Sequence, residues 1–266
     1  MEPRIRHAWD LTPRQAIALQ RDLARQVSLG GKPPKKPFLV AGCDASGSGR
    51  WSRRDERLIA GVLVFRYPGF EIVDHVSVSR PSPFPYIPGL LSFREAPLYA
   101  EALQQLKVTP DLLLCDGQGI AHPRGLGLAS HLGVLFDLPS IGVAKSRLVG
   151  KHREPGRSRG CSTRLLINGT VVGRVLRTRT GVRPLYISPG HRIGVEEAAE
   201  AVLAMATRYR LPEPTRAADI WVGQLRRGTK CAPQSRMRAL RKGHRRESAT
   251  ADPHSSRASC VPWPRR

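Results

Sequence analysis

Two aspartates end apolar segments in the same local pattern, and their type and placement suit metal chemistry. Asp44 follows the apolar run that begins at Phe38, and Asp116 follows the run that begins at Asp111; small, flexible residues come after both. If the two runs are neighbouring parallel strands, both carboxylates emerge at the sheet edge where open α/β sheets carry their sites. Close carboxylates repel and favour a shared cation, and their hard oxygens suit Mg²⁺ or Mn²⁺ better than zinc. Turn capping by each aspartate is the alternative, and the residues alone leave both interpretations open.

Glu95 has two competing interpretations. The sequence Ser92-Phe-Arg-Glu95 matches a capping box with Ser92 as N-cap, and this local pattern favours a capping role. Pro97 instead suits a helix that begins nearer Ala96, which would leave Glu95 at the helix mouth, facing the two aspartates.

Two further polar residues have a functional role only if the fold places them beside the two aspartates. Lys145 directly follows the apolar run that begins at Ile141, so it would place a cation at the same sheet edge; an isolated lysine there is usually solvated. His122 has no metal-ligand spacing to other residues, and alone is a surface or core histidine.

The segment from Pro85 to Gly89 presents an aromatic–aliphatic pair between prolines. Pro85 and Pro88 stiffen the chain around Tyr86 and Ile87. A stiff apolar wedge of this kind separates stacked bases in nucleic-acid-binding proteins. A rigid loop that packs Tyr86 on its own core is the alternative.

Strand and helix patterns alternate along the first 226 residues and must position these side chains. The order predicts a mixed sheet with helices on its faces, in which the strand at 38–44 lies beside the strand at 111–116. A first helix begins at Thr12-Pro13 and ends before Gly30. The other predicted elements are hairpins at 58–66/71–79 and 164–167/170–175, strands at 140–144 and 185–188, and helices at 94–107, 126–136, 195–210 and 215–226.

Charge identifies the class of partner. Forty-four Lys and Arg against 21 Asp and Glu give a net charge of +23, which attracts polyanions, so nucleic acid is the expected partner. Residues 226–266 hold 12 basic and 2 acidic side chains and few large apolar ones, so we expect a domain at 1–226 and a basic, disordered tail at 227–266.

Membrane and secreted proteins are disfavoured, and a cytoplasmic location is expected. The longest apolar stretch, 58–65, is too short to span a bilayer, and the N-terminus lacks the apolar core of a secretion signal. Five widely spaced cysteines without a C-x-x-C pair indicate neither a disulfide framework nor a zinc site.

Taken in order, the motifs resemble those of the endonuclease V family over about residues 10–226. The resemblance implies a ribonuclease H-like α/β fold and an Mg²⁺-dependent endodeoxyribonuclease, in which Mn²⁺ can substitute. It implies cleavage on the 3′ side of deaminated adenine (hypoxanthine), one nucleotide beyond it, leaving 5′-phosphate ends and initiating repair. The motifs are Gly42-Cys-Asp44, Pro85 through Glu95, Asp116-Gly-Gln-Gly119, His122-Pro-Arg124, Gly127 through His131, Gly142-Val-Ala-Lys145, Gly190-His-Arg192 and Arg210 through Arg216.

Catalytic roles follow from this resemblance, position by position. It makes Asp44 and Asp116 the metal ligands and Glu95 the third catalytic carboxylate. It implies that Lys145 stabilises phosphate charge and that His122 assists near the scissile strand.

Binding roles follow in the same way. Tyr86, with Ile87 and Pro88, corresponds to the strand-separating wedge, and Asp219 to a position that supplies a further acidic or metal-associated group. The residues matching the pocket for the flipped base are Gly89, Leu91, Gly117 and Leu128.

Two alternatives remain at this stage. One is an endoribonuclease specific for inosine in RNA, because the residues do not reveal how the 2′-hydroxyl is read. The other is a non-catalytic nucleic-acid-binding protein, which would not need Asp44, Glu95 and Asp116 together. A monomer that acts on deoxyinosine-containing DNA is the expectation.

Overall fold

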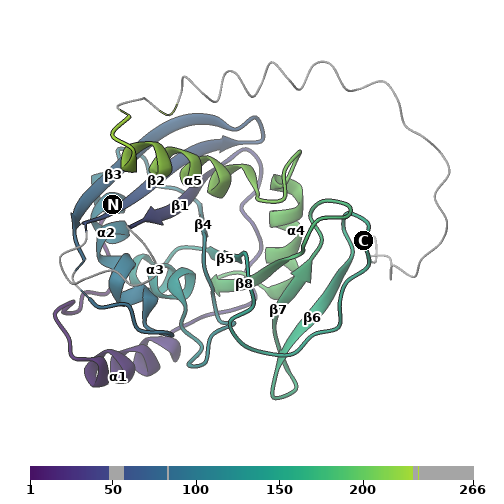
Figure 1. Cartoon of the computed structure of the whole chain (residues 1–266), viewed down its shortest axis with the longest axis horizontal. Helices are drawn as coiled ribbons and strands as arrows, with labels where there is room; N and C mark the ends of the chain where they lie inside the picture. The colour runs from purple at the N-terminus through teal and green to yellow at the C-terminus, as the bar shows by residue number, and fades with distance from the viewer. Residues whose placement is uncertain (48–56, 83, 230–232, 234–266) are drawn as a thin grey trace.

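A single mixed β-sheet organises the chain (Figure 1). The structure is a computed structural model, and it describes residues 1–47, 57–82, 84–229 and 233. The described strands lie in the order β3-β2-β1-β4-β5-β8-β7-β6. Their bounds are β1 Phe38–Ser46, β2 Arg57–Tyr67, β3 Glu71–Pro81, β4 Leu112–Cys115, β5 Ser140–Ala144, β6 Ser162–Ile167, β7 Thr170–Leu176 and β8 Leu185–His191.

Helices cover both faces of the sheet, as Figure 1 shows. Helices α4 (Val195–Met205) and α5 (Glu213–Arg226) pack on one face, and α2 (Leu91–Gln105) and α3 (Leu128–Phe136) pack on the other. Helix α1 (Pro13–Ala24) lies outside α3. Because side chains alternate along a strand, β1 sends Val40 into one apolar layer and Ala41 into the other. The predicted α/β fold class is confirmed.

The prediction that the two aspartate-bearing strands are adjacent is also confirmed. Strands β1 and β4 are parallel, with Cys43 opposite Cys115, so that Asp44 and Asp116 follow residues that are partners in the ladder. Strand β5 adds in parallel beside β4. The carboxyl ends of three parallel strands therefore meet at one edge of the sheet.

Helix α5 approaches this part of the sheet very closely. A Cβ atom on Gly42 would lie 2.1 Å from the carbonyl oxygen of Pro214, and one on Gly61 would lie 2.5 Å from the Val222 side chain. Both positions therefore need glycine. This contact fixes the height of α5 above β1 and β2.

Several predicted boundaries were wrong for local reasons. Helix α2 begins at Leu91 and includes Ser92, whose hydroxyl caps nothing, so the capping box is wrong. Helix α4 ends at Met205 rather than Arg210. Helix α5 begins before Thr215 because Pro214 is accommodated in its first turn, and the Thr215 hydroxyl donates to the Pro212 carbonyl instead of capping.

Two other expectations concern the chain as a whole. The cysteine spacing gave no sign of a disulfide framework, but Cys161 takes part in a disulfide. Within the described ranges, no helix has both the length and the apolar character needed to cross a membrane. The predicted tail at 227–266 lies outside the described residues except for 227–229 and 233.

Candidate active site

Three aspartates from three separate elements meet at the carboxyl edge of the parallel strands. Asp44 lies on β1, Asp116 directly after β4, and Asp219 on α5. Each offers a carboxylate oxygen, and these oxygens lie within 4.8 Å of one another. Asp44 is buried, Asp116 partly buried and Asp219 exposed, so the cluster opens to solvent on the α5 side.

Lys145 joins the aspartates from the end of β5. Its ammonium group lies 2.5 Å from Asp116 and 3.4 Å from Asp219. Although burial acts in the opposite direction, the surrounding carboxylates raise the pKa of Lys145 above its usual value, so it stays charged. We call Asp44, Asp116, Asp219 and Lys145, with Glu95 beside them, the carboxylate centre.

The electrostatics of this centre show an excess of negative charge. Burial, followed by the charges of Asp116 and Asp219, raises the pKa of Asp44 to about 8, and Lys145 only partly opposes this. Burial and then the charge of Asp116 also raise the pKa of Glu95 to about 8. One lysine does not balance so many close carboxylates.

This donor set fits a divalent cation of the magnesium class. Close carboxylates with raised pKa values are stabilised in their ionised form by a bound cation, and an all-oxygen ligand set favours Mg²⁺ or Mn²⁺. The aspartates and Lys145 line a cavity of about 880 Å³, which Arg226 and Arg227 also line, so basic side chains stand beside the carboxylates there.

Arg210 holds the backbone beside Lys145. Its guanidinium donates to the carbonyl of Lys145 at 2.9 Å and to the carbonyls of Arg183 and Pro184 at 2.8 Å each. One side chain thus joins the end of β5 to the segment that enters β8. Lys145 is positioned from its main chain as well as by its salt bridges.

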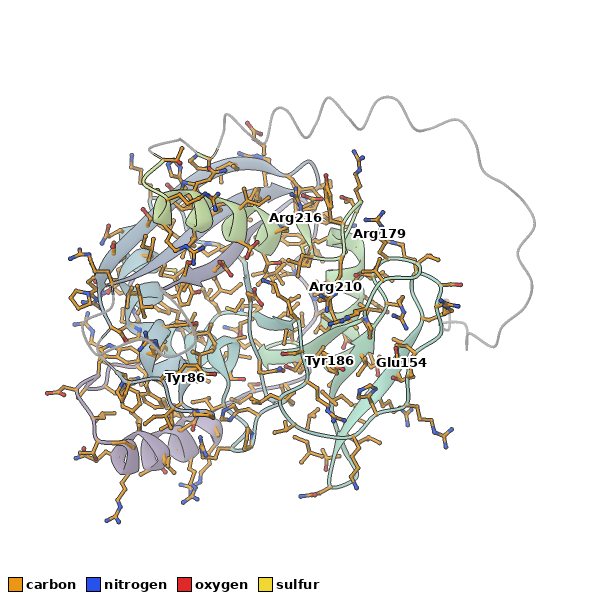
Figure 2. The ribbon with its side chains drawn as sticks, viewed as in Figure 1. Tyr86, Glu154, Arg179, Tyr186, Arg210 and Arg216 are labelled. Carbon is orange, nitrogen blue, oxygen red and sulfur yellow. The ribbon has the colours of Figure 1, made fainter. Side chains whose placement is uncertain are left out.

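The segment Pro85–Gly89, here called the proline loop, lies away from Arg210, as the position of Tyr86 in Figure 2 shows. The N–H of Leu90 donates to the carbonyl of Ile87 at 2.9 Å, and Gly89 has φ +79°. Pro88 followed by glycine at positive φ is the pattern of a type II turn. Tyr86 is 51% exposed, although Ile87 is partly buried against the cluster of Phe84, Leu90 and Phe93.

Three side chains from distant segments converge on the carbonyl of Gly89. Gln20 of α1 donates to it at 3.2 Å, His122 at 3.0 Å and Arg124 at 2.6 Å. Gln20 is fully buried, also donates to the carbonyl of Leu126 and accepts a hydrogen bond from Arg124. The turn of the proline loop is therefore fixed from outside.

His122 belongs to this second region. Its Nδ1 accepts the backbone N–H of Arg124, which leaves the proton on Nε2 to donate to Gly89. Burial, and then the charge of Arg124, lowers the pKa of His122 to about 4, so the ring is neutral. Both nitrogens are used within the loop assembly, and an assisting role at the scissile strand stays a prediction.

The residues assigned to a base pocket are only partly brought together. A Cβ atom on Gly117 would lie 3.5 Å from the side chain of Leu128, so these two positions are neighbours. Gly89 and Leu91 lie at the entrance to α2, on the proline-loop side. Their convergence on one base stays a prediction.

Sequence reasoning missed Gln20 and gave no role to Arg124 or Arg210. Gln20 had a detectable signal, because it lies at i+4 from Ala16 and i−3 from Leu23, on the apolar stripe of α1. A polar residue on a buried stripe needs a partner. The partners of the two arginines are backbone carbonyls far away in sequence, and no local pattern indicates them.

An α/β fold that gathers aspartates and a lysine beside the carboxyl ends of its parallel strands, in a strongly basic chain, is the arrangement expected of a metal-dependent nuclease. A profile of the family described as Endonuclease V matches residues 21–220. The chain therefore belongs to the endonuclease V family.

Relatives and solved structures agree with this assignment. The endonuclease V of Nostoc punctiforme is 49% identical over 215 residues, which are 80% of this chain and 95% of that protein. The crystal structure of endonuclease V from Streptomyces avermitilis has a TM-score of 0.77 at 38% identity, covering 87% of this chain and all of that one. A Ciona intestinalis endonuclease V, crystallised with a 24mer DNA containing an inosine followed by a ribo-adenosine, has a TM-score of 0.70 at 26% identity, covering 82% and 98%.

Proposed function

We propose that this nuclease hydrolyses DNA on the 3′ side of hypoxanthine, one nucleotide beyond the lesion, with Mg²⁺ as its ion and a 5′-phosphate product. The carboxylate centre carries this proposal, because it joins three aspartates, close enough to share an ion, to a charged lysine in one cavity. Membership of the family and the inosine-containing DNA bound by the Ciona protein support the substrate.

Each side chain of the carboxylate centre has a separate role in the proposed reaction. Asp44, Asp116 and Asp219 would hold the cation, which when bound acidifies a water molecule and neutralises charge on the phosphate. Lys145 donates a hydrogen bond to a phosphate oxygen as negative charge develops there. Glu95, whose pKa lies near 8, accepts a proton from the attacking water at its carboxylate.

The proline loop supplies recognition. Tyr86 fills the space that a flipped nucleotide leaves in the stack, with Ile87 and Pro88 as the rest of the wedge. Hypoxanthine pairs weakly, so it costs less to extrude than a normal base. The extruded base enters a pocket formed by Gly89, Leu91, Gly117 and Leu128.

The test uses matched labelled duplexes that differ only by inosine or adenosine at one position. With Mg²⁺, we expect one cut on the 3′ side of inosine and none in the adenosine duplex. Equal cutting of both duplexes, or a cut on the 5′ side, would contradict the proposal. Sequencing-ladder electrophoresis locates the cut to the nucleotide.

Inosine-containing RNA is a second candidate substrate. It is favoured by the Ciona complex, whose DNA carries a ribo-adenosine directly after the inosine. RNA and DNA arms of the same experiment separate the two, because faster single-turnover cleavage of the RNA would make it the main substrate.

We also infer a monomer with residues 1–226 as the catalytic domain, acting in the cytoplasm. In support, the described residues of one chain supply both the carboxylate centre and the proline loop. Light scattering on the full chain, and cleavage assays of a chain ending at residue 226, test the first two points.

A further inference from the structure

The edge of the sheet that carries the carboxylate centre continues past Lys145 into a second half of the sheet. Tyr186, near the start of β8, is opposite Ala144 at the end of β5. The end of β7 is opposite the start of β8, and the start of β6 is opposite the end of β7. The loops before β6 and between β7 and β8 therefore share one edge with Asp116 and Lys145.

This second half is strongly basic. From Lys145 to Arg183 the chain has 11 Lys and Arg and one acidic residue, Glu154, within 39 residues. The single acidic residue pairs with Arg177 at 2.8 Å. The excess of positive charge thus lies within the folded chain as well as in the tail.

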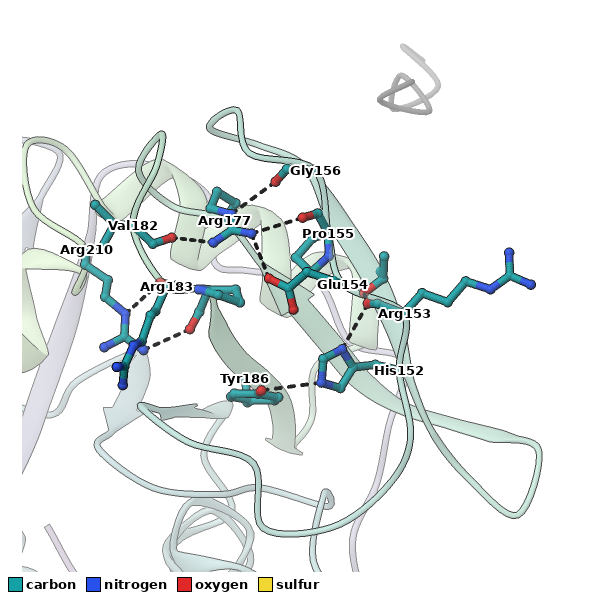
Figure 3. A network of polar contacts seen from close by, with 12 residues as sticks. His152, Arg153, Glu154, Pro155, Gly156, Arg177, Val182, Arg183, Tyr186 and Arg210 are labelled. Carbon is teal, nitrogen blue, oxygen red and sulfur yellow. Dashed lines mark hydrogen bonds and ion pairs between the residues drawn. The ribbon is translucent and has the colours of Figure 1, made fainter. Parts of the chain in front are cut away.

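Arg177 joins the two loops into one unit, as Figure 3 shows. It is buried, and its guanidinium donates to the carbonyls of Pro155, Gly156 and Val182 as well as to Glu154. Two backbone N–H groups add to this: that of Gly181 donates to the carbonyl of Arg157, and that of Arg159 donates to the Thr180 hydroxyl. We call residues 153–160 and 177–183 the basic double loop.

Arginines that the double loop does not need for its own structure lie exposed on it. Arg159 uses its guanidinium on the carbonyls of Leu203 and Ala206, and Arg177 is buried. The remaining four pair with no carboxylate among the residues that the structure describes. They are Arg153, Arg157, Arg179 and Arg183.

A direct structural link joins the double loop to the carboxylate centre. Arg210 donates to the carbonyls of both Lys145 and Arg183, so one guanidinium lies between the two basic residues. Burial, and then the charge of Arg183, lowers the pKa of Arg210, whereas the charge of Asp116 raises it; these groups are within electrostatic reach of one another. Positive charge therefore extends from Lys145 towards the double loop.

We infer that the basic double loop binds the sugar–phosphate backbone of the substrate strand on the 3′ side of the scissile bond. This inference rests on the proposed function for the direction of the strand. Figure 2 shows Tyr86 well apart from Arg179, Arg210 and Tyr186, whereas Arg210 joins the double loop to Lys145 of the carboxylate centre, so the double loop adjoins the centre and lies away from the lesion side. Because Arg177 fixes both loops beforehand, little conformational entropy is lost when phosphates bind.

The test varies the length of DNA on each side of the cut. One series of single-stranded inosine substrates keeps a constant 5′ part and carries from two to ten nucleotides beyond the scissile bond. A second series keeps the 3′ part constant and lengthens the 5′ part in the same way. For the wild-type chain with Mg²⁺, we expect the half-saturating enzyme concentration in single-turnover cleavage to fall about tenfold as the 3′ part lengthens. In the Arg179→Ala/Arg183→Ala variant this gain should disappear, and the negative slope of log affinity against log salt should become shallower by about 1.4.

A charge-matched control separates local binding from general attraction. Arg66 lies near the end of β2 at the opposite sheet edge, and Lys107 follows the end of α2 remote from Glu95. The Arg66→Ala/Lys107→Ala variant loses the same charge and should keep the full gain from 3′ extension. Melting temperatures check folding, and Arg153→Ala/Arg157→Ala replaces the first variant if it unfolds.

The outcomes distinguish this inference from the proposed function. If the Arg179/Arg183 variant gains as much from 3′ extension as the wild type, or instead loses a gain from 5′ extension, the inference is wrong while inosine cleavage stands. If the wild type cuts no inosine substrate, the proposed function fails. Binding of unmodified oligonucleotides then tests the double loop alone, and equal affinity of both double variants would overturn it.

Discussion

The carboxylate centre and the proline loop are held together by opposite physical means. In the centre, Asp44, Asp116 and Asp219 repel one another, and Lys145 offsets only part of the repulsion. In the proline loop, neutral and charged donors from Gln20, His122 and Arg124 all stabilise one carbonyl, that of Gly89.

This difference indicates which region is complete before substrate arrives. The centre needs a cation to reach a low-energy ionised state, so its chemistry depends on metal and pH. The proline loop is already fixed by hydrogen bonds, so its contribution depends on shape. Substitutions in the two regions should therefore have separable effects, on rate in the first and on affinity in the second.

Asp116→Asn should have the largest effect. It removes a carboxylate that pairs with Lys145 and lies beside Asp44, and we expect single-turnover cleavage to fall by about a thousandfold or more. Binding to an inosine duplex should be retained or tightened, because one negative charge near the phosphate is lost. If the variant still cut at the wild-type rate with Mg²⁺, Asp116 would have no role in the reaction.

Magnesium affinity should rise steeply with pH. Because burial and neighbouring carboxylates raise the pKa of Asp44 to about 8, cation binding must displace a proton below that pH. We expect close to a tenfold gain in affinity per pH unit between about pH 6 and pH 8, followed by a plateau. Calorimetric titration of Mg²⁺ at several pH values measures this, and a flat profile would mean that Asp44 is already ionised.

The raised pKa of Asp44 also makes the stability of the ion-free protein depend on pH. A carboxyl whose folded pKa lies above its unfolded value contributes stability that is complete below about pH 4 and is lost as pH rises to about 8. The increase in melting temperature caused by Mg²⁺ should therefore be larger at pH 8.5 than at pH 6. Asp116→Asn should reduce that difference.

The centre was the more predictable of the two regions. Asp44 and Asp116 each end a buried strand, and parallel pairing of those strands is enough to bring them together. Asp219 was different: its position relies on α5 resting against Gly42 through the Pro214 carbonyl, which no local pattern indicates.

Tyr86→Ala should weaken affinity without changing the chemistry. Loss of one stacking contact costs roughly 1–3 kcal/mol of binding free energy, which lowers affinity for an inosine duplex by about ten- to a hundredfold. A single-stranded inosine substrate needs less wedging and should be affected less, and Tyr86→Phe should behave like the wild type. Equal losses on both substrates would mean that Tyr86 supports the fold.

Gln20→Leu should have the smallest effect on function. It removes donors from the carbonyls of Gly89 and Leu126, so the free energy of unfolding should fall by roughly 1–3 kcal/mol. His122 and Arg124 still hold Gly89, so affinity for the inosine duplex should fall only about threefold. Denaturant melts check the stability, with Gln26→Leu on the exposed side of the same segment as the control; identical results for both would show that the Gly89 contact is inert.

The proline loop was predicted as a stiff exposed segment, but its support was not. Pro85, Pro88 and Gly89 define a turn locally, whereas the donors to the Gly89 carbonyl lie 69, 33 and 35 residues away in sequence. Convergence over such separations is set by tertiary packing. For the same reason, the net positive charge was evident from composition, whereas the assembly of the basic residues between Lys145 and Arg183 around Arg177 was not.

The central claim is that chemistry belongs to the carboxylate centre and lesion recognition to the proline loop. Single-turnover cleavage of one inosine duplex, measured across enzyme concentrations for Tyr86→Ala and Asp116→Asn beside direct binding titrations, tests it most directly. We predict a Tyr86→Ala maximum rate within about twofold of the wild type with half-saturation shifted about ten- to hundredfold, and an Asp116→Asn chain that binds but does not cut. The opposite result for Tyr86→Ala, a lower maximum cleavage rate at an unchanged half-saturating enzyme concentration, would contradict this assignment of chemistry and recognition to separate regions.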